Sequence, residues 1–182
     1  VEIIRKVALH EVVLLVVKSE AHGRKVQGML SQAHADQHNI RTITLNTNRS
    51  WMRDSGPIIV RRGDGTREAL QFRFTGWAKY ANHRLDEKIP AAVARFLGVP
   101  LTPARYRGQP VVLEGGAIDV NGSGTLITTE ECLLDAETQV RNPGFSKEDY
   151  EAVFRQYLGV RNVIWLGQGI EGDDTHGHVD DI

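Results

Sequence analysis

A repeat of about sixty residues constrains the fold of this chain more than any other feature of its sequence. Phe96-Leu97-Gly98-Val99 recurs as Tyr157-Leu158-Gly159-Val160, and the turn Gly63-Asp64-Gly65-Thr66 recurs as Gly122-Ser123-Gly124-Thr125. Around each turn the pattern predicts a hairpin, followed by a helix and a further strand. We therefore expect an α/β fold of pseudo-repeated ββαβ modules, of which about three are present.

An acidic residue recurs at the same point of each module. Asp54, Glu114 and Asp174 are equally spaced along the chain, and each follows a helix and a strand. Modules arranged around an axis would bring the loops that carry these acids together at one centre, as in propellers. We therefore expect a single site at which carboxylates from distant parts of the chain meet.

The densest group of chemically active side chains lies at the end of the chain, in Asp173-Asp174-Thr175-His176-Gly177-His178-Val179-Asp180-Asp181-Ile182. If this segment is extended, alternate side chains share a face, so His178 and Asp180 should lie together. A histidine beside a carboxylate can be held charged and serve as a general acid/base. The carboxylates could accept paired hydrogen bonds from a planar guanidinium. Alternatively, His176, His178 and Asp180 could bind a divalent metal ion.

Two other loops carry candidate residues. Trp51 precedes Asp54 in a polar loop, and because an indole normally packs on something, we interpret Trp51 as the wall of a pocket around Asp54. Glu114 precedes Gly115 and Gly116, which would let a ligand or another backbone segment approach closely. For Asp54 the competing interpretation is a carboxylate that caps a turn with Ser55 and Gly56 or pairs with Arg53. For Glu114 it is a strained turn with a solvated carboxylate.

The single cysteine, Cys132, is the one thiol that could act as a nucleophile in this sequence. It follows Glu130 and Glu131, and neighbouring carboxylates should raise the pKa of a thiol, which disfavours the reactive thiolate. We therefore expect Cys132 to be a buried structural residue.

The overall composition narrows the classes of protein. The net charge is −1 and there is no basic tract, which argues against a nucleic-acid partner. No apolar run is long enough to cross a membrane, and one cysteine provides no disulfide framework, so a cytoplasmic location is expected. The chain starts without Met and ends inside its acidic cluster, so we expect residues 1–182 to be one partial domain, incomplete at both ends.

Five motifs carry a resemblance to a known family: Trp51-Met52-Arg53-Asp54-Ser55-Gly56-Pro57, Leu113-Glu114-Gly115-Gly116, Thr128-Thr129-Glu130-Glu131-Cys132-Leu133-Leu134, Arg141-Asn142-Pro143 and Gly172-Asp173-Asp174-Thr175-His176-Gly177-His178-Val179-Asp180-Asp181. In this order and spacing they resemble the agmatine deiminase and bacterial peptidylarginine deiminase family. That family comprises guanidino-group-modifying enzymes with the pentein fold. The resemblance implies a five-module α/β propeller and a hydrolysis without metal or cofactor.

The resemblance also implies roles for individual residues. In the family a cysteine thiolate attacks the guanidinium carbon, ammonia leaves, and water resolves a covalent amidino intermediate. Asp54 and Asp180 match the aspartates that hold the guanidinium, and His178 matches the general acid/base. Glu114, Trp51 and Asp174 match pocket positions with less defined roles. The nucleophilic cysteine of the family lies beyond position 182, so the chain alone is expected to be inactive.

The expected reaction is hydrolysis of agmatine, a small guanidinium substrate, to N-carbamoylputrescine and ammonia. An arginine residue of a protein, converted to citrulline, is the alternative substrate within the family. Two alternatives come from other classes: a metal-dependent hydrolase using the terminal His/Asp cluster, and a non-catalytic guanidinium-binding module. An open propeller should expose an apolar edge, so self-association into a homo-oligomer is also expected.

Overall fold

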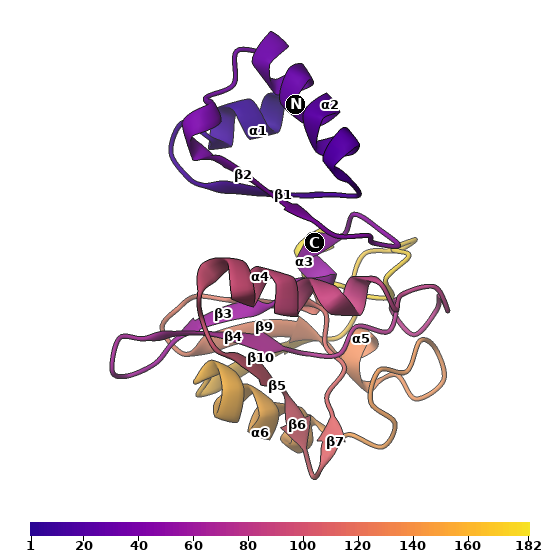
Figure 1. Cartoon of the computed structure of the whole chain (residues 1–182). Helices are drawn as coiled ribbons and strands as arrows, with labels where there is room; N and C mark the ends of the chain where they lie inside the picture. The colour runs from indigo at the N-terminus through magenta and orange to yellow at the C-terminus, as the bar shows by residue number, and fades with distance from the viewer. The chain divides into compact units, whose positions relative to one another are not determined.

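The computed structural model of the chain describes every residue from Val1 to Ile182 (Figure 1). The residues form two compact units, Val1–Thr47 and Asn48–Ile182. One domain over residues 1–182 stays a prediction. No helix in the chain is long and apolar enough to cross a membrane.

The first unit is a βαβ arrangement preceded by a short helix. Its elements are α1 (Glu2–Val7), β1 (Val13–Val17), α2 (Glu20–Gln32), the 3-10 helix η1 (Gln37–Asn39) and β2 (Ile40–Thr44). β1 and β2 pair in parallel, and the Ser19 side chain caps α2, accepting a hydrogen bond from the backbone N–H of His22. The continuous apolar run from Val12 to Val17 predicts a buried strand. This prediction is wrong, because a two-stranded sheet leaves both strands at an edge and only Val17 of β1 is buried.

The second unit contains two modules with the same topology. The first consists of β3 (Ile58–Arg61), β4 (Arg67–Gln71), α4 (Ile89–Leu97) and β5 (Leu101–Pro103); the second consists of β8 (Ile118–Val120), β9 (Thr125–Thr129), α6 (Lys147–Leu158) and β10 (Asn162–Leu166). In each module the first two strands form an antiparallel hairpin, and the third strand pairs in parallel with the second after the helix. The ββαβ repeat predicted from the sequence is therefore confirmed in both modules.

Local sequence signals explain where the helices of these modules begin and end. Ser146 and Asp149 form the predicted capping box at the start of α6. Gly98 and Gly159, the repeated glycines, close α4 and α6 in the left-handed conformation with φ of 65° and 67°. A side chain at either position would be strained, so the repeat preserves the two helix ends.

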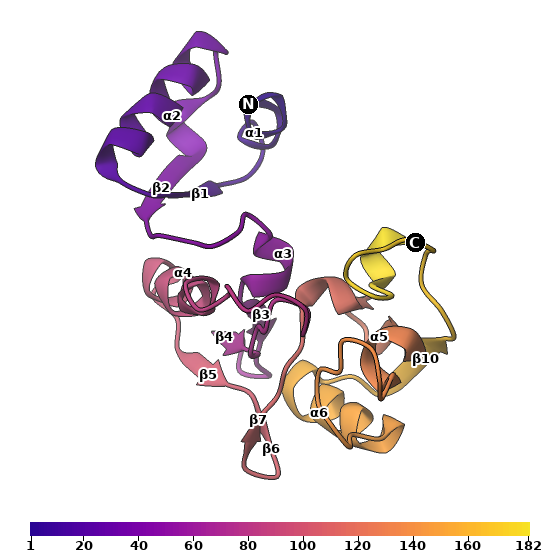
Figure 2. The same ribbon diagram turned by 90° about the vertical axis from the view of Figure 1, so that its right-hand side faces the viewer.

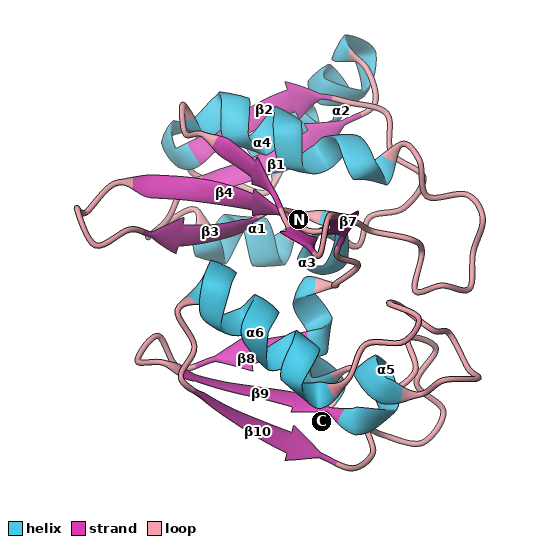
Figure 3. Ribbon diagram, turned by 90° about the horizontal axis from the view of Figure 1, so that it is seen from below, coloured by secondary structure: helices cyan, strands magenta, loops and turns pink.

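The main core of the second unit lies where α6 crosses the sheet of β8, β9 and β10 (Figure 3). Tyr150, Val153 and Phe154 of α6 are fully buried there, and Leu126 of β9 is their fully buried partner from the sheet. Burying a side chain of this size contributes about 1.5–3 kcal/mol to stability. This rigid layer supports the loops that carry the candidate site.

Short elements connect the modules and carry the loops of the site. They are α3 (Met52–Ser55), η2 (Asp86–Lys88), the small hairpin of β6 (Arg105–Tyr106) and β7 (Gln109–Pro110), η3 (Gly115–Ala117), α5 (Glu130–Leu134) and η4 (Val179–Asp181). Figure 2 shows the last segment of the chain in yellow, between β10 and the C-terminus. The polar loop expected around Trp51 and Asp54 contains the helical turn α3. The expectation of an extended segment at the end of the chain is wrong, because Val179–Asp181 form the 3-10 turn η4.

Candidate active site

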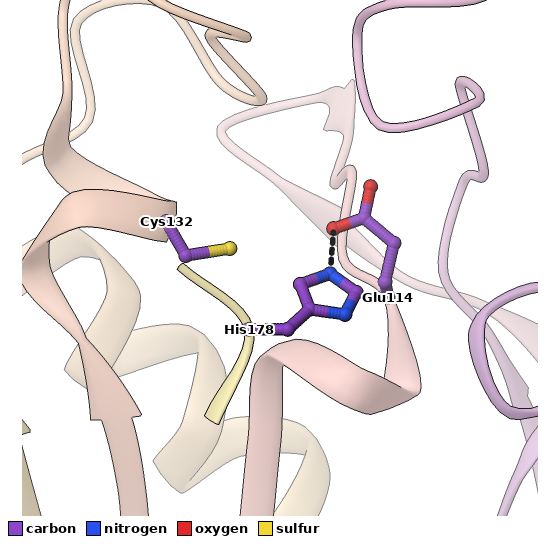
Figure 4. A group of neighbouring side chains, drawn as sticks. All are labelled: Glu114, Cys132 and His178. Atoms are coloured by element: carbon purple, nitrogen blue, oxygen red, sulfur yellow. Dashed lines mark ion pairs between the residues drawn. The ribbon is translucent and has the colours of Figure 1, made fainter. Parts of the chain in front are cut away.

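Four side chains from three separate segments meet at one centre. Asp54 comes from α3, Glu114 immediately precedes η3, and His178 and Asp180 lie at the start of η4 and within it. The Nδ1 atom of His178 is 3.6 Å from Oδ1 of Asp180 and 3.8 Å from Oδ1 of Asp54. Its Nε2 atom is 3.7 Å from Oε2 of Glu114 (Figure 4). One imidazole therefore faces three carboxylates.

Two adjacent glycines make this convergence sterically feasible. A Cβ atom on Gly116 would lie 2.5 Å from Nδ1 of His178 and 2.7 Å from Oδ1 of Asp54. A Cβ atom on Gly115 would lie 2.1 Å from the carbonyl oxygen of Arg53. Since real Cβ contacts do not occur below 3.0 Å, both positions require a residue without a side chain. The close approach predicted at these glycines is made by other residues of the chain: the Arg53 backbone at Gly115, and the Asp54 and His178 side chains at Gly116.

Asp54 is held on both of its oxygens. Oδ1 accepts a hydrogen bond of 3.1 Å from the backbone N–H of Gly116, and Oδ2 accepts one of 2.9 Å from the indole N–H of Trp77. Burial raises the pKa of Asp54, and this outweighs the lowering by the His178 imidazole and the Trp77 indole. The side chain is nearly buried and Arg53 pairs with Asp180 instead, so the alternative of a turn cap or an Arg53 pair is wrong for Asp54.

Glu114 is fully buried, so the solvated alternative is wrong here too. Its Oε2 atom accepts a hydrogen bond of 3.2 Å from Nε of Arg141, whose side chain is also fully buried. Burial is the largest single influence and raises the pKa of Glu114, but His178 and Arg141 together outweigh it, so the pKa of Glu114 is lowered overall. The carboxylate is therefore ionised beside the imidazole.

His178 is buried and carries a raised pKa. Burial, the largest influence, lowers the pKa of the imidazole, but the facing carboxylates of Glu114 and then Asp54 outweigh it. The backbone N–H groups of Gly177 and His178 donate to one oxygen of Asp173, which fixes the loop just before the imidazole. A charged imidazole at this place can donate a proton to a leaving group, and after deprotonation it can accept one.

A pocket of about 570 Å³ opens over this centre, with aromatic residues along its wall. Trp51, which is 61% exposed, lines it together with Trp77 and Tyr80. Asp174 lies at the rim, where its carboxylate accepts hydrogen bonds from Nζ of Lys79 (2.5 Å) and from the hydroxyl of Tyr80 (2.8 Å). Two of the three repeated acids thus line this pocket, Asp54 at its base and Asp174 at its edge, while Glu114 lies behind it, fully buried against His178.

The alternative metal site of His176, His178 and Asp180 is not brought together. Nε2 of His176 lies 2.9 Å from Asp135 and its Nδ1 lies 3.5 Å from Glu131, so this imidazole is held away from the centre. Two other groups offer donor atoms within 4.8 Å of one another: Glu114 with Cys132 and His178, and His178 with Asp180 and Asp181. Arg141 already neutralises the first group and Arg53, 3.7 Å from Asp180, the second, so we assign no metal ion to either.

Cys132 lies in α5 with its sulfur directed toward the His178 ring (Figure 4). The thiol is buried, as expected. Burial is the largest cause of its raised pKa, and the acids that add to the effect are Glu114, Asp173 and Asp54. The predicted cause, the adjacent acids of the sequence, is therefore wrong, although the direction of the pKa shift is right. A neutral, buried thiol is a poor nucleophile.

Comparison with known proteins decides the family. The model of the Porphyromonas-type peptidyl-arginine deiminase family matches residues 1–182. The chain belongs to this family. It is 40% identical to the agmatine deiminase of Ectopseudomonas mendocina and 41% identical to that of Pseudomonas syringae pv. tomato, in each case over 84% of the chain and 41% of the relative.

The fold comparison agrees with the family. The structure of the agmatine deiminase of Enterococcus faecalis matches 100% of this chain and 47% of its own with a TM-score of 0.79 at 29% identity. The pentein fold implied by the sequence motifs is therefore confirmed. The chain spans about half the length of the relatives it matches.

In this family member the sequence motifs indicated most of the centre but missed two residues that hold it. These residues are Trp77, whose indole N–H donates to Asp54, and Arg141, which stands in one of the five motifs. Trp77, like Trp51, is an indole in a polar loop, and this signal identifies it as a candidate pocket residue. No local signal marks Arg141, because its partner Glu114 lies 27 positions away in the chain.

Proposed function

We propose that this chain is part of an agmatine deiminase, which hydrolyses agmatine to N-carbamoylputrescine and ammonia. The observation that carries the proposal is the buried His178 facing three carboxylates beneath an aromatic pocket. A guanidinium is a planar cation with N–H groups in a fixed fork, and carboxylates can each accept a pair of its hydrogen bonds. The relatives at about 40% identity are agmatine deiminases, which supports the choice of substrate.

The proposed reaction uses the residues in distinct roles. Asp54 and Asp180 accept hydrogen bonds from the guanidinium and orient its central carbon. A cysteine thiolate supplied from outside these residues attacks that carbon, and the C–N bond breaks as His178 gives a proton to the leaving ammonia. His178 then takes a proton from water, whose oxygen attacks the amidino carbon. The C–S bond breaks, the remaining hydroxyl proton passes to solvent, where it converts the released ammonia to ammonium, and the ureido product and the thiolate are released.

The rim of the pocket favours a substrate with a second cation. Asp174 offers a carboxylate there, and the ammonium of agmatine could replace or join Lys79 beside it. Trp51 and Trp77 line the same pocket as Asp54 and Asp174, and their apolar rings suit an alkyl chain. A peptide-bound arginine has no second ammonium at that distance. The proposal includes a cytoplasmic location and a small-molecule partner, and self-association of the chain stays a prediction.

Turnover by a full-length protein that carries this sequence tests the proposal. In the presence of a chelator we expect ureido product and ammonia from agmatine and much less from an arginine peptide.

Asp174→Asn should raise the KM for agmatine by about five- to tenfold, the effect of one charged contact at an exposed rim, and leave the KM for the peptide unchanged. Faster turnover of the peptide would favour the alternative substrate. Activity that needs added zinc would support the metal-dependent hydrolase. Absence of turnover with either substrate would support the non-catalytic guanidinium-binding module.

Binding of agmatine should weaken on acidification earlier than an ordinary aspartate would allow. Because burial raises the pKa of Asp54, this carboxylate takes up its proton at a higher pH than usual as the pH falls. The protonated group loses its charge and half of its capacity to accept hydrogen bonds. Isothermal titration calorimetry between about pH 8 and pH 4 should show this loss as a rising Kd.

The variant Asp54→Asn separates this effect from the titration of His178. It should bind agmatine weakly at every pH, and the pH dependence that remains near and above pH 6.5 belongs to the imidazole. A Kd of the unaltered protein that stays constant down to about pH 4 would show that Asp54 does not carry the cation.

A further inference from the structure

We propose that Arg141 is a positioning residue of this site, which holds Glu114 and the loop before His178 in the arrangement that presents the imidazole to substrate. The inference rests on the proposed function and adds a residue to it. Arg141 does not line the pocket and does not touch the position of the guanidinium. It acts through Glu114 and through the backbone of the loop.

The three nitrogens of the Arg141 guanidinium each have a partner. Nε donates to Oε2 of Glu114 (3.2 Å), Nη1 donates to the carbonyl oxygen of Gln139 (2.8 Å), and Nη2 donates to the carbonyl oxygen of Thr175 (2.5 Å). Thr175 lies three residues before His178 in the same loop. Arg141 thus connects the segment that carries Glu114 with the segment that carries His178. Only a guanidinium, with donors in a fixed fork, can make all three bonds at once.

The charges of the buried centre require a second cation. Glu114 is fully buried, and Asp54, also nearly buried, competes with it for the single charge of His178. Asp180 is a third carboxylate that faces His178, and it lies 3.7 Å from Arg53. Cys132 and Tyr150, which also face this region, stay neutral because burial raises the pKa of both. Without Arg141, burial would favour the protonated form of Glu114.

The charge of Glu114 influences the pKa of His178 more strongly than the charge of Arg141 does. The charge of Arg141 by itself lowers the pKa of His178, but this influence is smaller than the raising influence of Glu114. By keeping Glu114 ionised, Arg141 preserves the stronger influence, which raises the pKa of His178. Its expected effect on the reaction therefore appears as a pH dependence.

The next residue, Asn142, provides a matched control. Its side chain is buried and forms hydrogen bonds with the backbone N–H and carbonyl of Val112 and with the hydroxyl of Tyr150. It therefore stabilises the segment that carries Glu114 without contributing a charge. Asn142→Ala should lower the melting temperature but should not change the protonation of Glu114. Arg141→Met removes the charge and the fork, and Arg141→Lys keeps the charge and loses the fork.

The experiment measures kcat and KM for agmatine against pH, together with the melting temperature, in full-length protein with each of these substitutions. In Arg141→Met, protonation of Glu114 should move the acid limb of kcat to higher pH by about one unit or more, and the maximum of kcat should fall by about tenfold. The loss of the Glu114 charge beside His178 should move the alkaline limb to lower pH. Arg141→Lys should leave the limb in place and lower kcat by a few-fold. A lower melting temperature in Arg141→Met with the limb unmoved, as expected for Asn142→Ala, would overturn the inference.

A second measurement does not depend on turnover or on the methionine variant. The carboxyl carbon of Glu114 can be followed by NMR against pH in the unaltered protein and in Arg141→Gln. The titration midpoint of Glu114 should lie higher in the variant. If the unaltered protein does not turn over agmatine, the proposed function fails while this titration still tests Arg141. An unchanged midpoint overturns the positioning role by itself.

Discussion

Replacing Gly116 by alanine should reduce the affinity for agmatine by at least about a hundredfold while the fold stays intact. The added Cβ would lie 2.5 Å from Nδ1 of His178, 2.7 Å from Oδ1 of Asp54 and 2.8 Å from Oδ1 of Asp180. All three groups must move, and two of them are the proposed acceptors for the guanidinium. Since a hydrogen bond to a charged group contributes about 1.5–3 kcal/mol, misplacing both carboxylates predicts a loss of at least roughly a hundredfold.

The backbone of Gly116 does not oppose this substitution. Its φ lies outside the left-handed region, so alanine can adopt the same conformation, and the damage should be confined to the site. Gly167→Ala is the matched control, because an added Cβ there meets no atom within 4 Å and its φ is also unstrained. Calorimetric titration with agmatine and thermal unfolding should separate the two variants. An affinity of Gly116→Ala within about threefold of the unaltered protein would contradict the proposed position of the guanidinium.

The fold could be predicted to a large extent because its signals are local. The capping box at Ser146 and the left-handed glycines after α4 and α6 act within one turn of the chain, so they can be predicted from the sequence without knowledge of the tertiary structure. The hairpin turns can be predicted for the same reason. The burial of β1 could not be predicted, because it depends on how many strands lie beside it.

The site could be predicted only in part, because its residues are joined by contacts between distant segments. Motifs pointed to Asp54 and His178, but the bond from Trp77 to Asp54 spans 23 positions and no periodicity indicates it. The terminal segment was expected to be extended. Asp173 instead accepts hydrogen bonds from the N–H groups of three following residues, Thr175, Gly177 and His178, and folds the loop back on itself. The proximity of His178 to Asp180 therefore arises from a 3-10 turn.

Replacing His178 by glutamine should lower kcat for agmatine by about a hundred- to ten-thousandfold, the usual contribution of general acid/base catalysis, with a smaller change in KM. Glutamine fills a similar space and can donate one hydrogen bond to Glu114, but it cannot transfer a proton. The neighbouring His176 provides the control, because its imidazole is held by Asp135 and Glu131 outside the centre. His176→Gln should retain kcat within about tenfold. Equal losses in the two variants would mean that the loop, and not the imidazole of His178, is what the reaction requires.

The same pair of variants should differ in how their stability depends on pH. The pKa of His178 is raised in the folded state, so its contribution to stability is fully present below the ordinary value of 6.5 and is lost as the pH rises through the folded value. Thermal unfolding of the unaltered protein should therefore show a decline in this alkaline window. His178→Gln should remove that part of the decline and His176→Gln should keep it. Because Glu114 and Asp54 both raise the pKa of this imidazole, the proposed acid for the leaving ammonia is also the group that makes the stability of the buried centre depend on pH.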